Sequence, residues 1–126
     1  MANGISDYLE NELLDQVFKN AAAPAVTAVY VSLHTADPGD TGASEVTGGS
    51  YIRKVATFDV AASGATANSG NITWTGMPAV TVTHVACWDA ESSGNCLWSG
   101  ALTAQKVLNA GDSFQINTGD LDVTLD

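Results

Sequence analysis

Apolar residues recur at helical spacing near the N-terminus of the chain. Leu9, Leu13 and Val17 follow one another at intervals of four residues, and Phe18 lies on the adjoining flank. Side chains at this spacing form one apolar stripe along an α-helix, with polar residues on the opposite face. The pattern predicts an amphipathic helix over residues 5–20. Its stripe packs either against the protein's own core or against a neighbouring subunit, and the sequence leaves both open.

Beyond residue 25 the hydrophobic pattern changes to alternation at every second residue, which is typical of half-buried strands. Residues 29–34 and 120–126 alternate in this way. Residues 79–89 and 95–103 have the pattern of two hairpin arms that are joined by a turn containing Ser and Gly. Both arms carry apolar residues on each face. This predicts central strands that are covered on both sides, or covered on one side by another subunit.

Strand signals recur at short intervals through the rest of the chain. About eight short strands at spacings of about ten residues are typical of a sandwich or a jelly roll. The sequence contains no internal repeat and no linker of the kind that separates domains. It therefore predicts a mainly β fold over residues 1–126, a single-domain antiparallel β-sandwich of jelly-roll character with one N-terminal amphipathic helix.

The longest interruption of the strand pattern is the loop over residues 35–49, which is acidic and rich in Gly and Thr. Its length of about fifteen residues exceeds that of most connections in a compact domain, and such loops are usually functional. We therefore expect the loop, its flanks and the helix stripe to form the interaction surface. The candidate residues are Leu9, Leu13, Val17, Phe18, His34, Asp37, Asp40, Glu45, Tyr51 and Arg53.

The charge of the chain argues against one class of partner. Four Lys and Arg residues stand against fourteen Asp and Glu, and the formal net charge is −10. This field repels phosphate backbones, and the few basic residues form no patch, so we expect no binding to nucleic acid. A membrane-spanning helix needs about 20 apolar residues in a row, and no run in the chain approaches this length. The acidic N-terminus also lacks the features of an export signal. We expect no membrane contact, and assembly in a cytoplasm.

The two cysteines, Cys87 and Cys96, lie in the two arms of the expected hairpin. If the hairpin is symmetric about its turn, they face each other, and a cross-strand disulfide is geometrically possible. The alternative is a pair of adjacent, buried and reduced thiols that act as small apolar groups. Synthesis in a cytoplasm favours this alternative.

Two metal sites are conceivable from residue types, and neither has the required spacing. His84, Cys87 and Cys96 offer zinc ligands, but positions 84 and 87 of an extended strand point to opposite faces. Asp37, Asp40 and Glu45 offer oxygen ligands for calcium, but the spacing of a calcium-binding loop is missing, and turn formation explains the Asp residues more simply. We expect no metal and no cofactor.

The sequence has no motif of a known catalytic type. It lacks a nucleophile elbow, a Gly-rich phosphate loop before a helix, and a metal-spaced pair of histidines. A pair of carboxylates that folding brings together, as in a glycosidase, would escape such a search. We interpret the protein as a non-enzyme.

Four stretches of the chain carry a resemblance that covers essentially its whole length. The chain resembles a family of small tailed-phage virion proteins that are labelled tail-fibre or minor structural proteins. One segment is VYVSLHTADPGDTGASEVTGGSYIRKVATF at residues 29–58, and its block LHTADPGDTG…EV.GGSY.R at residues 33–53 is the most specific part of the resemblance. The other matching segments are ISDYLENELLD at residues 5–15, THVACWDAESSGNCLWSGALTAQKVLNAGDSFQI at 83–116 and LDVTLD at 121–126.

The resemblance implies a β-sandwich with a non-catalytic, structural role at the virion surface, assembled in the host cytoplasm. Because the chain has no repeats or heptads, we favour a capsid decoration (cement) protein that binds the major capsid protein and stabilises the head surface. The alternative is a tail-tip, tail-fibre or head-spike subunit that binds a host surface receptor. Either role predicts a homo-oligomer, a trimer or a dimer.

Overall fold

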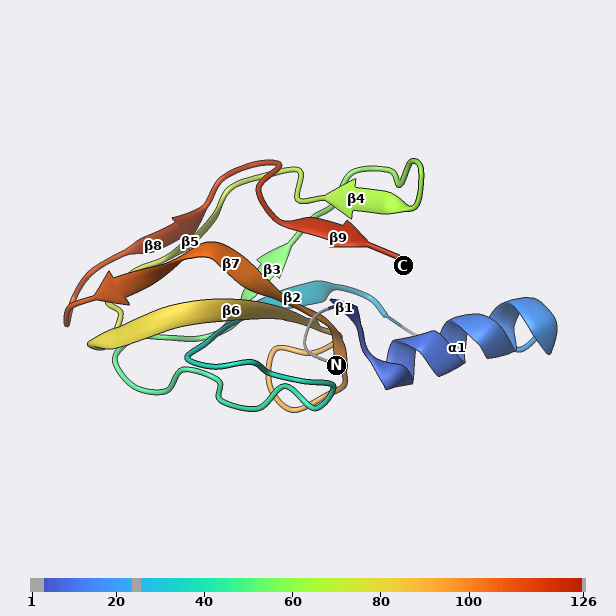
Figure 1. Ribbon diagram of the computed structural model, residues 1–126, viewed down its shortest axis with the longest axis horizontal. Helices are drawn as coiled ribbons and strands as arrows, with labels where there is room; N and C mark the ends of the chain where they lie inside the picture. Colours follow the sequence, from blue (N-terminus) through green and yellow to red (C-terminus); the bar gives the residue numbers. More distant parts are fainter. Residues whose placement is uncertain (1–3, 24–25, 126) are drawn as a thin grey trace.

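The computed structural model describes residues 4–23 and 26–125. Within them the chain forms one α-helix and nine β-strands, so the predicted mainly β fold with an N-terminal helix is confirmed (Figure 1). The helix is α1 (Asp7–Phe18). The strands are β1 (Gly4–Ile5), β2 (Val29–His34), β3 (Lys54–Ala56), β4 (Ala65–Ala67), β5 (Ile72–Trp74), β6 (Val80–Trp88), β7 (Cys96–Leu108), β8 (Phe114–Ile116) and β9 (Asp122–Thr124).

These strands pair antiparallel throughout and form one large sheet and two small ladders. The order of strands in the large sheet is β1-β7-β6-β2-β3, and the ladders are β4-β9 and β5-β8. Figure 1 shows the ladders as a second layer that lies over the large sheet, with α1 at one end. The arrangement is that of a β-sandwich.

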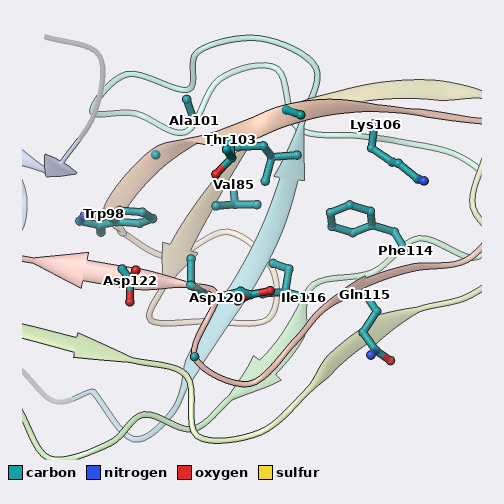
Figure 2. Close-up of a pocket in the computed structure, with 15 residues that line it drawn as sticks. Val85, Trp98, Ala101, Thr103, Lys106, Phe114, Gln115, Ile116, Asp120 and Asp122 are labelled. Carbon is teal, nitrogen blue, oxygen red and sulfur yellow. The ribbon is translucent and has the colours of Figure 1, made fainter.

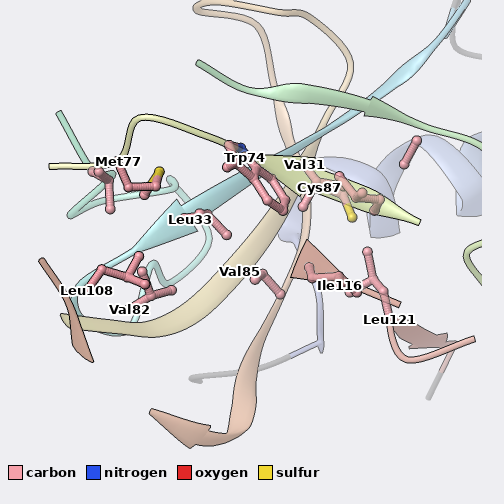
Figure 3. Packing of buried hydrophobic residues seen from close by; sticks show 13 residues of the cluster. Val31, Leu33, Trp74, Met77, Val82, Val85, Cys87, Leu108, Ile116 and Leu121 are labelled. Carbon is pink, nitrogen blue, oxygen red and sulfur yellow. The ribbon is translucent and has the colours of Figure 1, made fainter. Parts of the chain in front are cut away.

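The hydrophobic core lies between the two layers (Figure 3). Alternate residues of β2 and β6 enter it, because successive side chains of a strand point to opposite faces. Trp74 of β5 is fully buried, and its indole N–H donates to the carbonyl of Ile52 at 2.9 Å. The cluster consists of Val31, Leu33, Val46, Ala56, Ile72, Trp74, Met77, Val82, Val85, Cys87, Leu108, Ile116 and Leu121.

The outer face of β2 and β6 is covered by the loop over residues 35–49. The loop folds back along β2, where the Val46 N–H donates to the Leu33 carbonyl at 2.9 Å. Gly42 lies so close to the ring of Trp88 that a Cβ at this position would overlap it. Both faces of the central strands are therefore covered, and the cover on the outer face comes from within the chain.

Helix α1 is shorter than the helix that the sequence predicts over residues 5–20, because Ile5 belongs to β1. Ser6 caps the helix with a hydroxyl that accepts a hydrogen bond from the Leu9 N–H at 3.3 Å. The Ser6 N–H donates to the Leu97 carbonyl of β7 at 2.9 Å, which attaches the first turn to the large sheet. No residue of α1 is buried, and the helix extends away from the body (Figure 1).

The facing arrangement that symmetry predicts for Cys87 and Cys96 is not found. Cys87 lies opposite Trp98, and Trp88 lies opposite Cys96, because a register shift falls between Cys87 and Trp88. Both cysteines are free thiols, and they belong to different buried clusters. Burial raises the pKa of Cys87 to about 12 and that of Cys96 to about 11, so both thiols stay protonated and unreactive at neutral pH.

Candidate functional site

The residues that flank the long loop form a buried network, with Arg53 at its centre. The Arg53 guanidinium donates to both carboxylate oxygens of Glu45, at 3.0 Å from Nε and 2.9 Å from Nη2. Its Nη1 donates to the carbonyls of Ala90 and Ser93 at 3.1 and 2.8 Å. The guanidinium carbon also lies 3.7 Å from the centroid of the Trp88 ring. Arg53 thus joins the loop to the turn that connects β6 and β7.

Tyr51 adds a further contact to Glu45. Its hydroxyl donates to Oε2 of Glu45 at 2.7 Å and accepts from the Leu33 N–H at 3.1 Å. Burial, and then the hydrogen bond to Glu45, raise the pKa of Tyr51 far above its usual value. Burial opposes ionisation of Glu45, but the hydrogen bonds from Arg53 and Tyr51 outweigh it and hold the pKa of the carboxyl below its usual value. Glu45 is therefore an ionised acceptor at neutral pH.

His34 attaches the loop to β2 and is fully buried. Its Nδ1 donates to the carbonyl of Ala43 at 2.7 Å, which leaves Nε2 to accept from the Ser32 hydroxyl at 2.6 Å. The indole N–H of Trp88 donates to the same Ser32 oxygen at 2.7 Å. Burial lowers the pKa of His34, so the neutral ring is favoured. Both ring nitrogens have partners inside the protein, so His34 has a structural role in fixing the loop to β2.

The predicted contact surface therefore divides into buried and exposed parts. His34 and Arg53 lie inside the protein, so their side chains offer no surface to a partner. Asp37 is exposed, but its Oδ1 accepts from the Gly39 N–H at 2.9 Å and shapes a turn. The helix residues Val17 and Phe18 are 70% and 80% exposed.

Two classes of site have no counterpart in the part of the chain that the structure describes. No group of three His, Cys, Asp or Glu side chains among residues 4–23 and 26–125 could hold a metal ion. No helix in these residues is long and apolar enough to cross a membrane.

A cleft that the sequence did not predict lies between β7 and the C-terminal strands (Figure 2). Its volume is about 780 Å³, and its walls are formed by residues 100–106 and 114–122. Buried side chains of the core, Val85, Ile116 and Leu121, also line it. The sandwich is thus open along this side, and the cleft reaches down to the core.

The path of β7 shapes one wall of the cleft. Val82 of β6 pairs with Lys106 of β7, and His84 pairs with Ala101, so residues 102–105 bulge away from the ladder. A bulge bends its strand and is common beside binding sites. The strand also continues to Leu108, whereas the sequence predicted that this hairpin arm ends at residue 103.

The cleft combines aromatic faces with hydrogen-bonding groups. Figure 2 shows Trp98 and Asp122 toward one end, and Phe114 and Lys106 toward the other. The polar side chains that line the cleft are Thr103, Lys106, Gln115, Asp120 and Asp122. Such a lining suits a ligand that has apolar faces and polar edges, because each kind of surface finds its complement.

One signal in the sequence could have indicated this site. Trp98 is followed two residues later by Gly100 on the same face of β7. A Cβ on Gly100 would overlap the Trp98 ring, so the glycine lets the ring lie along the strand. Glycine inside a strand often marks such a close approach.

Comparison with models of known protein families finds a match that covers almost the whole chain. A family model described as podophage GP4 fiber I protein gp80 matches residues 4–124, which include the helix, both layers and the cleft. A search of curated proteins finds no match. The family's description confirms the resemblance to small tailed-phage virion proteins. It also fits the fibre alternative better than capsid decoration, the role that the sequence favoured.

Proposed function

The chain belongs to the podophage GP4 fiber I protein family, and from this premise we propose that it is the fibre subunit that binds a saccharide on the host cell surface. Family membership makes it a structural protein of a tailed-phage virion. The cleft between β7 and the C-terminal strands is the observation that carries the proposal. Its volume of about 780 Å³ lies within the range of about 300–1,000 Å³ that is usual for ligand sites.

The lining of the cleft matches the chemistry of a sugar. A sugar ring carries C–H groups on its faces and hydroxyls around its edge. Trp98 and Phe114 offer apolar ring surfaces for the faces. Asp120 and Asp122 accept hydrogen bonds from hydroxyls, and Gln115 both donates and accepts. The net charge of −10 disfavours acidic polymers, so the ligand class is a neutral or amino-bearing saccharide.

The long loop is a poorer candidate for this role. The sequence placed a receptor contact there, but the buried contacts of His34, Glu45 and Arg53 hold the loop against the body. A fixed cover serves the fold, whereas the cleft presents aromatic rings and hydrogen-bonding side chains that a ligand can contact. We propose binding without cleavage, since attachment requires that the saccharide stay intact.

Capsid decoration is the second candidate function. The exposed apolar end of α1, with Val17 and Phe18, calls for a protein partner, and the major capsid protein would supply one. Labelling of intact particles with an antibody against this protein separates the two functions. Label at the tail supports the fibre, and label over the head surface supports decoration.

Staining of host cells with fluorescent protein tests the saccharide site. The wild-type chain is expected to stain the cells, and soluble host polysaccharide is expected to compete. The double variant Asp120→Asn and Asp122→Asn should bind about tenfold more weakly, because it loses hydrogen bonds to charged acceptors. The matched control is Asp59→Asn, which makes the same change at an exposed residue outside the cleft.

Two results would contradict the proposal. One is a wild-type protein that stains no host cell at any concentration. The other is a cleft variant that stains as strongly as the wild type while the control also binds normally.

A further inference from the structure

The apolar stripe of helix α1 is exposed to solvent at the C-terminal end of the helix, which is its free end. Leu14, Val17 and Phe18 are 54%, 70% and 80% exposed, although they belong to the amphipathic pattern. The helix has 12 residues and none of them is buried. Isolated helices shorter than about 12–15 residues are marginal in water, and most gain stability by packing an apolar face. The free end of α1 therefore calls for a protein surface.

An apolar groove lies beside the other end of the same helix. Its volume is about 200 Å³. One wall is formed by Ile5, Leu9 and Leu13, and the other includes Val123 and Leu125 near the C-terminus. Leu125 is 60% exposed, so the groove is open to solvent. The groove and the free end of α1 have matching apolar chemistry, but within one chain they are at different ends of the helix.

An antiparallel pair of helices brings the two features together. If two copies of α1 pair about a twofold axis at Leu13, the first half of each helix lies beside the second half of the other. Leu9 then lies level with Val17 of the second copy, where the groove is. Asp7, in the acidic first turn, lies level with Lys19 at the end of the other helix. The helix dipoles also oppose each other favourably.

At the other positions where residues of the two helices lie side by side, no carboxylate faces another carboxylate. Glu10 lies level with Gln16, and Asn11 with Asp15. This matters because each copy carries a net charge of −10, which opposes association in general. A surface whose own charges are complementary about a twofold axis fits a second copy of itself, since such an interface uses the same patch on both subunits.

We propose that α1 is a self-association helix, which pairs antiparallel with α1 of a second copy so that Val17 and Phe18 of each copy cover the groove of the other. The pair buries the apolar end of both helices and closes both grooves with one contact. The groove shares Trp98 with the cleft, but neither α1 nor the groove includes the acidic or amide residues of the cleft, so variants of those polar residues leave the helix contact intact.

Light scattering on the full chain, measured across a range of concentrations at physiological salt, tests the pair. The mass of the wild type is expected to rise from one copy to two. The double variant Val17→Asp and Phe18→Asp should stay at one copy throughout. The control is Val55→Asp on β3, which adds one charge of the same sign at a residue that is 59% exposed and lies outside the groove; its mass should follow the wild type.

A charge exchange tests the direction of the helices. Lys19→Glu is expected to weaken association about fivefold, because it places two carboxylates at the same level. Adding Asp7→Lys should restore association. Within one chain these positions are about 18 Å apart along the helix, so the rescue must act between copies. Circular dichroism checks that each variant keeps its helix.

Three results would overturn the proposal. The first is a wild type that remains a single copy at the highest soluble concentration. The second is a mass of three copies, which excludes a closed twofold pair. The third is a charge exchange that keeps its helix and fails to restore association.

Discussion

The loop over residues 35–49 is held to the body by buried hydrogen bonds, whereas helix α1 is held mainly at its first turn. The loop is polar, but its half-buried Glu45 and the buried flanking residues Arg53 and His34 each find hydrogen-bond partners within the protein. The helix is apolar along one face, yet its end at Phe18 is 80% exposed to solvent. The loop is therefore fixed to the body because its polar groups have hydrogen-bond partners there. The polarity of a segment alone does not reveal whether that segment is free to bind a partner.

The largest loss of stability is expected from Arg53→Ala, which disrupts the contacts that hold the loop to the body. The substitution leaves the Glu45 carboxylate without its bidentate partner and removes two contacts to the turn between β6 and β7. Loss of one member of a buried ion pair costs about 3–5 kcal/mol. We expect the free energy of unfolding in urea to fall by about 4 kcal/mol.

The control for this change is Lys106→Ala, which removes one positive charge from an exposed residue of β7. It should change the free energy of unfolding by less than about 0.5 kcal/mol. An Arg53 variant as stable as this control would show that the loop does not depend on the buried network.

The second effect concerns the contact between Gly42 and Trp88. Gly42→Ala adds a Cβ that overlaps the indole ring, and it places an L-residue at a φ of +77°. The two penalties together should cost about 3 kcal/mol. Gly39→Ala is a matched control, because its φ is +60° but nothing lies within 4 Å of its Cβ; it should cost about 1 kcal/mol. Equal losses in the two variants would mean that the loop can move away from Trp88.

The third effect is a dependence of stability on pH. Burial lowers the pKa of His34 from 6.5, so the unfolded chain binds more protons than the folded one just below pH 6.5. Stability should therefore fall as the pH drops below about 6.5, by at most about 1.4 kcal/mol per pH unit. The lowered pKa of Glu45 adds a further loss below its ordinary value of 4.5.

Urea titrations between pH 7.5 and pH 4 measure this dependence. In the variant His34→Asn the slope between pH 6.5 and pH 5 should become flatter, because the titrating group is gone. An unchanged slope would assign the dependence to other groups.

Local patterns predicted the elements of this fold and could not predict their long-range partners. The strand at Val29–His34 and the presence of helix α1 follow from alternation and from the i, i+4 stripe. The register shift after Cys87, which separates the two thiols, depends on how β7 packs as a whole. The pairing of Arg53 with Glu45 also depends on the return of the loop to the sheet. The spacing of Trp98 and Gly100 indicates one wall of the cleft, but the opposite wall could not be predicted, because its strands lie beside β7 only in the folded chain.

The smallest effect is expected at the free end of α1. In the single-copy state, Val17→Asp removes an apolar side chain that is already 70% exposed and adds no buried charge. The free energy of unfolding, measured in urea at dilute concentration, should change by less than about 0.5 kcal/mol.

Ile116→Asp is the control, because it makes the same kind of change at a residue that is only 7% exposed. It should prevent stable folding, since an unpaired charge would enter the core. If Val17→Asp instead costs several kcal/mol in dilute solution, α1 packs against its own chain, and the contrast with the loop disappears. A small loss in dilute solution together with a large loss of association at high concentration would assign the apolar end of α1 to contact between molecules, because only an interface that forms between copies depends on their concentration.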